Sequence, residues 1–417
     1  MPSLVGAPSR PAAPRRAVPA AAWTALGKQH ANRLFIFGLG YTGLGAATYF
    51  QQRGWEVAGT CRTQEKCERL ARHDIHTHYF DPTEFNNLSG KGVEALRHAT
   101  HVLSTVPPDA DHAGDPVVMA HAQQLGEHAE EYRWVGYISS TSVYGDYEGE
   151  WVDEGSELRA ADGKGWSRVM AEHEWLALHD QFGLPVHIFR CGGIYGPQRS
   201  ALDAVQRAAA GGGGSASAAR RAAQRYIARC HVFDICQTLE ASMRHSRPGT
   251  AYNIADDDPA DRATVMAYAA ELLQRSAAGL PPPDGSWGLP TPQPSGAAVL
   301  AGVGGSDAAS AASGGGGGGS SSGSLPELAE PLSSVGTATS SGSSYDSGDD
   351  ALQQQGWRRG AGLERPRGGG GAPGRRLEEK RVRNARIKKE LGVQLAFPTY
   401  REGLAGIAAG DLRPFER

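Results

Sequence analysis

The sequence predicts an α/β protein: a Rossmann-type, doubly wound parallel sheet with a small C-terminal substrate lobe, interrupted by disordered inserts. Three observations support this fold class. Short apolar runs alternate with helical stretches through residues 34–138, a glycine-rich turn follows the first run, and Gly/Ser/Ala-rich segments break the pattern later in the chain. Strands that alternate with helices are typical of a parallel sheet covered on both faces.

The strands and helices are expected in a regular order. The predicted strands are "LFIF", "WEVAGTCR", "IHTHYF", "THVLSTV" and "WVGYIS". Near the C-terminus, a helix is expected to end at Leu391, because Gly392 stands where helices commonly stop, and a second helix follows "FPTY".

Composition limits how much of the chain folds. The chain has 417 residues, and its 56 glycines cluster with alanine and serine, so the folded part is smaller than the length suggests. The net charge of −3 does not indicate a nucleic-acid or membrane binder. No run of 18 apolar residues is present, and the five scattered cysteines lack zinc-ligand spacing, which favours a reducing compartment and no metal site.

Three segments are expected to lie outside the fold. Residues 1–31 are rich in Ala, Pro, Arg and Ser, and the first acidic residue is Glu56, which is typical of a transit peptide and favours a chloroplast location. The alternatives are a mitochondrial transit peptide, or a disordered tail of a protein with a cytoplasmic location. Residues 209–219 and 276–375 cannot bury enough apolar surface to fold. Residues 32–275 and 376–417 therefore form the folded part.

The glycine turn "FIFGLGYTG" predicts a dinucleotide site. Gly38 permits the tight turn, Gly40 lets a diphosphate approach the backbone, and Gly43 lets helix and strand pack closely. Tyr41 and Thr42 complete the turn at a helix N-terminus, whose partial charge favours phosphate. The alternative is a glycine turn with no ligand. Residues 32–275 are thus expected to be an NAD(P)-binding domain with part of the substrate lobe.

The end of the second strand favours NADP over NAD. An NAD site would place Asp or Glu there, whereas this chain has Thr60 and Arg62. Arg62 can pair with a ribose 2′-phosphate, although a solvated surface arginine is the alternative. Asp81, after the third strand, is placed to contact the adenine or to cap a loop.

Three later motifs carry a family resemblance. They are "ISSTSVYGD", "FRCGGIYGPQR" and "RCHVFDI". With the glycine turn they occur in the order typical of the extended short-chain dehydrogenase/reductases, and the chain resembles an atypical subgroup of the epimerase/dehydratase branch. The resemblance covers residues 33–275 and 378–407. It implies that 376–417 is the C-terminal part of the substrate lobe.

The resemblance implies roles for several residues. Ser140 corresponds to the catalytic hydroxyl, and residues 190–197 to the strand and loop that close over nicotinamide and substrate. His231 and Asp234 correspond to a buried connection between the cofactor domain and the substrate lobe. Each has a structural alternative: Ser140 as a turn cap, and His231 with Asp234 as a hydrogen-bonded pair.

The chain departs from the family at its catalytic Tyr-x-x-x-Lys. Lys164 stands at the tyrosine position and Arg168 at the lysine position, and no tyrosine occurs between Tyr147 and Tyr195. Arg168 can hold ribose hydroxyls and supply positive charge, but arginine does not act as an acid. Lys164 can donate a proton only if it is desolvated, and its polar loop favours exposure. Tyr144, Tyr147 and Tyr195 are the other candidate phenols.

Two functions follow, and both remain open at this point. The first is an NAD(P)-dependent oxidoreductase or epimerase/dehydratase-like enzyme with an altered Tyr/Lys site, acting on a carbonyl or alcohol of a small molecule. The second is a non-catalytic NAD(P)-binding sensor or scaffold. The resemblance implies a possible homodimer. The basic run at 376–389 is more typical of a solvated helix face than of an RNA site, so nucleic acid and membrane partners are not expected.

Overall fold

The structure is a computed structural model that describes residues 32–72, 74–82, 88–108, 114–160, 163–212, 222–284 and 378–416. The predicted transit peptide, residues 213–219 of the short insert and residues 285–375 of the long insert lie outside the described residues. Helix α9 (Arg262–Ala277) extends two residues past the predicted start of the long insert.

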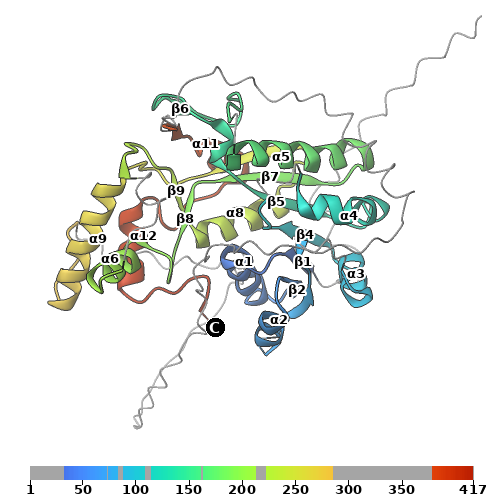
Figure 1. The fold of residues 1–417 in the computed structure, drawn as a ribbon, viewed down its shortest axis with the longest axis horizontal. Coiled ribbons are helices and arrows are strands. Elements are labelled where there is room, and N and C mark those ends of the chain that lie inside the picture. Colours follow the sequence, from blue (N-terminus) through green and yellow to red (C-terminus); the bar gives the residue numbers. More distant parts are fainter. Residues whose placement is uncertain are drawn as a thin grey trace, which may run out of the picture.

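A parallel sheet of seven strands forms the centre of the molecule (Figure 1). The strand order is β10-β7-β5-β4-β1-β2-β3. From β1 the chain adds β2 and β3 on one side, then returns and adds β4 and the later strands on the other side of β1. Such a switch point opens a crevice at the carboxyl ends of the strands, where ligands bind in this fold class. The strands are β1 (Arg33–Phe37), β2 (Glu56–Cys61), β3 (His76–Tyr79), β4 (His101–Ser104), β5 (Trp134–Ser140), β7 (Val186–Cys191) and β10 (Thr250–Ile254).

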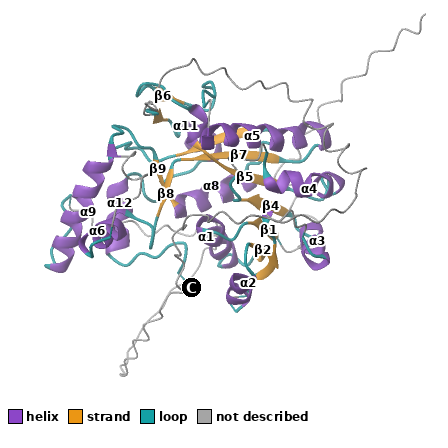
Figure 2. Cartoon of the chain, in the orientation of Figure 1, coloured by secondary structure: helices purple, strands orange, loops and turns teal. Residues whose placement is uncertain are grey.

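Helices cover both faces of the sheet, which confirms the predicted fold class (Figure 2). One apolar layer lies beneath α1 (Tyr41–Gln51), α2 (Gln64–Ala71), α8 (Val232–Arg244) and α11 (Ala385–Leu391). The opposite layer lies beneath α3 (Gly90–Arg97), α4 (Pro116–Glu127) and α5 (Gly163–Phe182). All five predicted strands and both C-terminal helices are present, and α11 ends at Leu391, followed by Gly392 in the left-handed conformation.

A small lobe stands beyond the carboxyl side of the sheet. Helices α6 (Ala201–Ala209), α9 and α12 (Tyr400–Ala408) pack around a core that includes Leu202, Leu272 and Leu404. Two further short parallel ribbons are present: β6 (Trp151–Val152) with β11 (Arg381–Val382), and β8 (Gly193–Tyr195) with β9 (Arg229–His231). Strand β9 contacts α12 of the lobe.

The C-terminal segment contacts distant parts of the chain. Asp234, at the start of α8, accepts hydrogen bonds from the backbone N–H groups of Ala396 (2.7 Å) and Phe397 (3.2 Å). The side chain of Gln52 donates to the carbonyl of Glu416. Residues 378–416 therefore complete the fold that residues 32–284 begin.

The buried face of α5 does not follow its apolar residues. Trp166, Met170, His173 and Ala177 recur at helical spacing, which is typical of a core or a dimer interface, yet they are half-buried or exposed. The large buried side chains are instead Trp175 and Leu178, which pack against β5 and α4 with Ala171. The buried face also includes a charged residue, Glu172, and a pattern read from apolar residues alone misses a face that carries a buried charge.

We expect His187 to make the fold acid-sensitive. Its Nδ1–H donates to the carbonyl of Val135 (3.3 Å), and its Nε2 accepts from the N–H of Arg247 (3.0 Å), so the buried ring is held neutral. Burial lowers the pKa of His187 to about 4. A histidine whose pKa is lowered in the folded state stabilises the fold above its ordinary pKa near 6.5, and this stability is lost as pH falls towards 4.

Urea unfolding at pH 7.5 and pH 5.0 tests this expectation. From the two pKa values, His187 contributes a loss of about 2 kcal/mol between these conditions. His187→Gln should be less stable than the wild type at pH 7.5 and should lose about 2 kcal/mol less on acidification. Other buried histidines, such as His101, whose pKa is lowered to about 3, leave part of the acid sensitivity in the variant. An unchanged pH dependence would contradict the assignment.

Candidate functional site

The glycine turn after β1 is held by two threonines. Gly38 has φ +86°, its N–H donates to Oγ1 of Thr60 (2.8 Å), and its carbonyl accepts from Oγ1 of Thr105 (2.5 Å). Thr60 lies on β2 and Thr105 follows β4, so both strands beside β1 hold the turn. Sequence reasoning missed both roles. The sequence did contain a signal for them, because a threonine stands at or just after the carboxyl end of each apolar run that neighbours β1.

The other two glycines of the turn face different surroundings. A Cβ atom at Gly43 would lie 2.2 Å from the carbonyl oxygen of Gly38, so only glycine fits there. A Cβ atom at Gly40 would meet no atom within 4 Å. Gly40 therefore borders open space directly before Tyr41, where α1 begins, and no acidic residue lies in the first turn of α1. This surface fits the diphosphate of a dinucleotide, because backbone N–H groups and the helix dipole face an approachable opening.

Arg62 and Asp81 lie at the same end of the sheet. Arg62 directly follows β2 and is exposed, and Asp81 lies two residues beyond the end of β3 and is half-buried. Strands β1, β2 and β3 are parallel neighbours, so their carboxyl ends lie at the same edge of the sheet. The glycine turn, Arg62 and Asp81 therefore all lie at this edge. The placement agrees with the order expected for a dinucleotide that extends from the turn towards β2.

Ser140 is the last residue of β5 and caps the turn that follows. Its Oγ accepts from the N–H of Ser142 (3.1 Å) at the start of a short 3-10 helix, Thr141–Tyr144. The cap fixes the position of the hydroxyl oxygen and leaves its proton able to donate. Ser140 thus lies at the carboxyl edge of the sheet, and its hydroxyl can still donate a hydrogen bond.

The two cations of α5 are placed very differently. Nη1 of Arg168 donates to the carbonyl of Ile138 (2.5 Å), which holds the guanidinium against β5 two residues before Ser140. Lys164, one turn earlier, is exposed. The structure therefore places the guanidinium of Arg168 against Tyr137 and Ile138 of β5. It leaves Lys164 without the burial that its role as a proton donor requires.

Each of the three candidate phenols already donates a hydrogen bond within the fold. Tyr144 donates to Oδ1 of Asn253 (2.7 Å), Tyr147 to the carbonyl of Glu157 (2.8 Å), and Tyr195 to the carbonyl of Thr399 (3.3 Å). Burial raises the pKa of Tyr144 to about 12. These contacts disfavour the three phenols as substitutes for the missing catalytic tyrosine.

A buried ion pair contacts Ser139, the residue before Ser140. Arg190, on β7, donates from Nε and Nη2 to the carboxylate of Glu172, on α5, with the shortest contact at 2.8 Å. Ser139 donates to the same carboxylate (2.5 Å), and Nη1 of Arg190 donates to the hydroxyl of Tyr144 (3.0 Å). The sheet register places Ser139 and Asn253 directly beside Arg190 on the two neighbouring strands. Sequence reasoning missed Glu172, although an arginine inside an apolar strand indicates a buried acidic partner.

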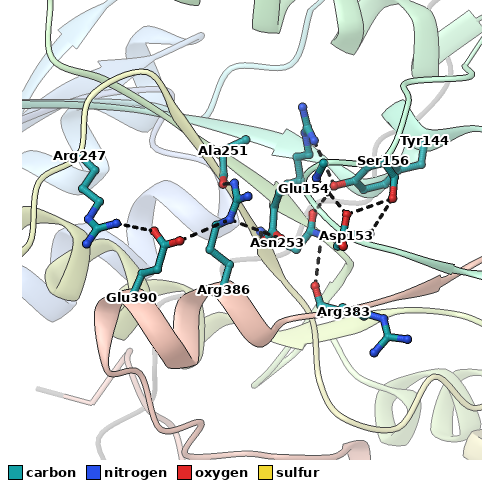
Figure 3. A network of polar contacts seen from close by, with 12 residues as sticks. Tyr144, Asp153, Glu154, Ser156, Arg247, Ala251, Asn253, Arg383, Arg386 and Glu390 are labelled. Atoms are coloured by element: carbon teal, nitrogen blue, oxygen red, sulfur yellow. Dashed lines mark hydrogen bonds and ion pairs between the residues drawn. The ribbon is translucent and has the colours of Figure 1, made fainter.

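The network continues into the C-terminal segment (Figure 3). Nδ2 of Asn253 donates to the carbonyl of Arg383 (3.2 Å), and Arg386 donates to the carbonyl of Ala251 (3.1 Å). Lys388, in the same basic run, pairs with Asp257 at 2.5 Å. Arg386 and Lys388, two cations of the basic run, therefore have partners within the fold.

The two remaining motifs contact the glycine turn and the lobe. Pro197, in the loop after β8, accepts a hydrogen bond from the hydroxyl of Tyr41 (3.0 Å), so the loop closes onto the turn. His231 caps α8 by accepting from the N–H of Phe233 (3.2 Å), while Asp234 binds residues 396–397. Burial raises the pKa of Asp234 to about 7. The expected hydrogen-bonded pair of His231 with Asp234 is therefore wrong, because each side chain bonds a separate backbone segment.

The comparison with known families decides the assignment. Residues 34–255 match the NAD dependent epimerase/dehydratase family. The chain belongs to this family. The resemblance that the motifs carry is therefore confirmed.

Several relatives of this epimerase/dehydratase family member are known. It is 30% identical to a functionally unknown conserved protein from Silicibacter pomeroyi DSS, with a TM-score of 0.56, covering 91% of this chain and 99% of the other. It is 31% identical over 171 residues to Protein YeeZ of Escherichia coli (strain K12), a match that spans 40% of this chain and only 61% of that relative. A dTDP-glucose 4,6-dehydratase from Bacillus anthracis str. Ames, in complex with NAD, is 18% identical over 58% of this chain and 82% of the other, with a TM-score of 0.46.

Two structural features are absent from the described part of this family member. No described helix is long and apolar enough to cross a membrane. Within the same residues, no three His, Cys, Asp or Glu side chains gather where they could hold a metal ion.

Proposed function

We propose that this chain binds a nicotinamide dinucleotide at the carboxyl end of its sheet and acts as an oxidoreductase or epimerase/dehydratase-like enzyme on a carbonyl or alcohol of a small molecule. One observation carries the proposal. The turn from Gly38 to Gly43 is held in shape by Thr60 and Thr105, and it leaves open space at Gly40 before the N-terminus of α1. Such a turn favours a diphosphate.

The chain's own residues have distinct tasks in this proposal. The bound nicotinamide would accept or supply hydride. Arg168, held by the carbonyl of Ile138, orients ribose hydroxyls and adds positive charge beside the reacting oxygen. Ser140 donates its hydroxyl proton as a hydrogen bond to that oxygen. Arg62 supports a preference for NADP, because its exposed guanidinium follows the strand end where the ribose is expected.

A non-catalytic sensor or scaffold is the second candidate. It is favoured by the exposure of Lys164 to solvent. It is also favoured by the hydroxyls of Tyr144, Tyr147 and Tyr195, each of which already donates a hydrogen bond within the fold. The chloroplast location and the homodimer remain predictions.

Binding and turnover separate the two functions. The purified chain is titrated with NADH and NADPH by fluorescence, and the absorbance of the reduced nicotinamide is then followed with a panel of carbonyl compounds. Binding with turnover supports the enzyme. Binding with no turnover on any compound supports the sensor, and the absence of binding would reject both.

We expect Arg168→Ala to weaken dinucleotide binding about tenfold, the usual effect of losing one hydrogen bond to a charged group. Lys164→Ala is the matched control, because it removes a cation four residues away on the same helix. Its affinity should stay within about twofold of the wild type, since an exposed charge contributes little. Arg168→Lys, which installs the family's usual residue, should recover part of the affinity. Equal losses in the two alanine variants would contradict the separate placements of Arg168 and Lys164.

A further inference from the structure

Arg199 follows the loop that closes on the glycine turn. Its guanidinium lies over the ring of Tyr41, 5.2 Å from the ring centroid, and the side chain is exposed. Tyr41 is the first residue of α1 and directly follows Gly40. The arginine therefore lies over the first residue of α1, next in sequence to Gly40.

The Tyr41 ring beneath Arg199 is held by several contacts. The hydroxyl of Tyr41 donates to the carbonyl of Pro197 (3.0 Å), and its ring packs against Phe415 at a centroid distance of 5.2 Å. The close approach extends to Gly196, where a Cβ atom would lie 2.6 Å from the Tyr41 hydroxyl. The loop, the C-terminal segment and α1 thus fix the ring on which the guanidinium rests.

No carboxylate forms an ion pair with Arg199 within the described part of the chain, although Asp203 carries its charge near the same Tyr41 ring. The carboxylate of Asp203 is used by Ser200, from which it accepts the N–H (2.7 Å) and the hydroxyl (2.5 Å). Asp411 pairs with Arg413. The positive charge of Arg199 therefore adds to the partial positive charge at the N-terminus of α1.

We propose that Arg199 binds the diphosphate of the dinucleotide from the side opposite the glycine turn. This inference rests on the proposed function. The open space at Gly40 admits the diphosphate to the backbone, and the guanidinium of Arg199 rests on the ring of Tyr41, the residue that follows Gly40. A guanidinium presents parallel N–H donors that match phosphate oxygens. The motif R-x-x-G-x-Y-G-P-Q-R is then one side of a clamp, with α1 as the other.

The role differs from that of Arg62 in a measurable way. A group that binds the diphosphate acts equally on NADH and NADPH, whereas one that binds the 2′-phosphate acts on NADPH alone. Arg199→Ala should therefore weaken both dinucleotides by the same factor, and Arg62→Ala should weaken only NADPH.

The experiment uses the full chain with NADH, NADPH, ADP and adenosine as probes, and affinities are measured by calorimetry at several salt concentrations. Arg199→Ala should weaken NADH, NADPH and ADP about tenfold or more and leave adenosine unchanged, because a charged hydrogen bond to phosphate is lost. The salt dependence of binding should become shallower, since fewer charges are paired. Arg199→Lys should recover part of the affinity. Arg207→Ala, which removes an exposed arginine of α6, is the matched control and should match the wild type.

The outcomes that overturn the proposal are distinct. Wild-type affinity of Arg199→Ala for NADH and ADP would reject the role of Arg199 and leave the proposed function intact. Equal loss of adenosine binding would show a change of the site as a whole and would also reject it. Failure of the wild-type chain to bind any of the dinucleotides would reject the proposed function, and this inference with it.

Discussion

Gly43→Ala is expected to abolish dinucleotide binding and to destabilise the fold. The added methyl group would lie 2.2 Å from the carbonyl oxygen of Gly38, far inside van der Waals contact. Either α1 or the turn must move, and the hydrogen bond from Thr105 to that same carbonyl is then strained. We expect a loss of roughly 3 kcal/mol in stability, towards the upper end of overpacking costs, and at least about a hundredfold loss of affinity.

Gly40→Ala is the matched variant that separates binding from folding. Its methyl group meets no atom within 4 Å, and the φ of −75° at Gly40 suits any residue. The unfolding midpoint in urea should match the wild type. Affinity should still fall, because the methyl group occupies the space through which the diphosphate approaches the backbone. A wild-type midpoint for Gly43→Ala, or wild-type affinity for Gly40→Ala, would contradict the geometry of the turn.

The second large effect is expected at the buried ion pair. Arg190→Met removes the cation from Glu172, whose side chain is only 2% exposed, and leaves Ser139 as its hydrogen-bond donor. An uncompensated buried charge costs about 3–5 kcal/mol. Tyr144 also loses the donor that Arg190 provides. Urea unfolding at neutral pH should show a fall in stability of this size.

Two controls make the result specific. The double variant Glu172→Met/Arg190→Met removes both charges, and we expect it to be more stable than Arg190→Met, because no unpaired charge stays buried. Arg244→Met removes the cation of an exposed pair with Glu240 on α8 and should cost less than about 1 kcal/mol. A similar cost for Arg190→Met and Arg244→Met would show that burial of the pair contributes nothing.

The order of elements and the glycine turn could be predicted from the sequence because they depend on local chemistry. Apolar runs of strand length, punctuated by glycine, form strands and turns in many contexts. Gly38, Gly40 and Gly43 could be assigned separate roles from their spacing alone. The face of α5 could not be predicted in this way, because Glu172 is buried by a partner, Arg190, that lies on another element.

The sequence by itself determined the fold class, the family and the position of the dinucleotide turn, since each depends on residues close together in the chain. Only the tertiary structure decided where the cations of the candidate site lie. Arg168 is held against β5, Lys164 stands in solvent, and Arg199 is brought to Tyr41 from 158 residues away along the chain. These positions depend on packing between segments that lie far apart in the chain. The spacing of residue types along the chain does not show which side chains that packing buries.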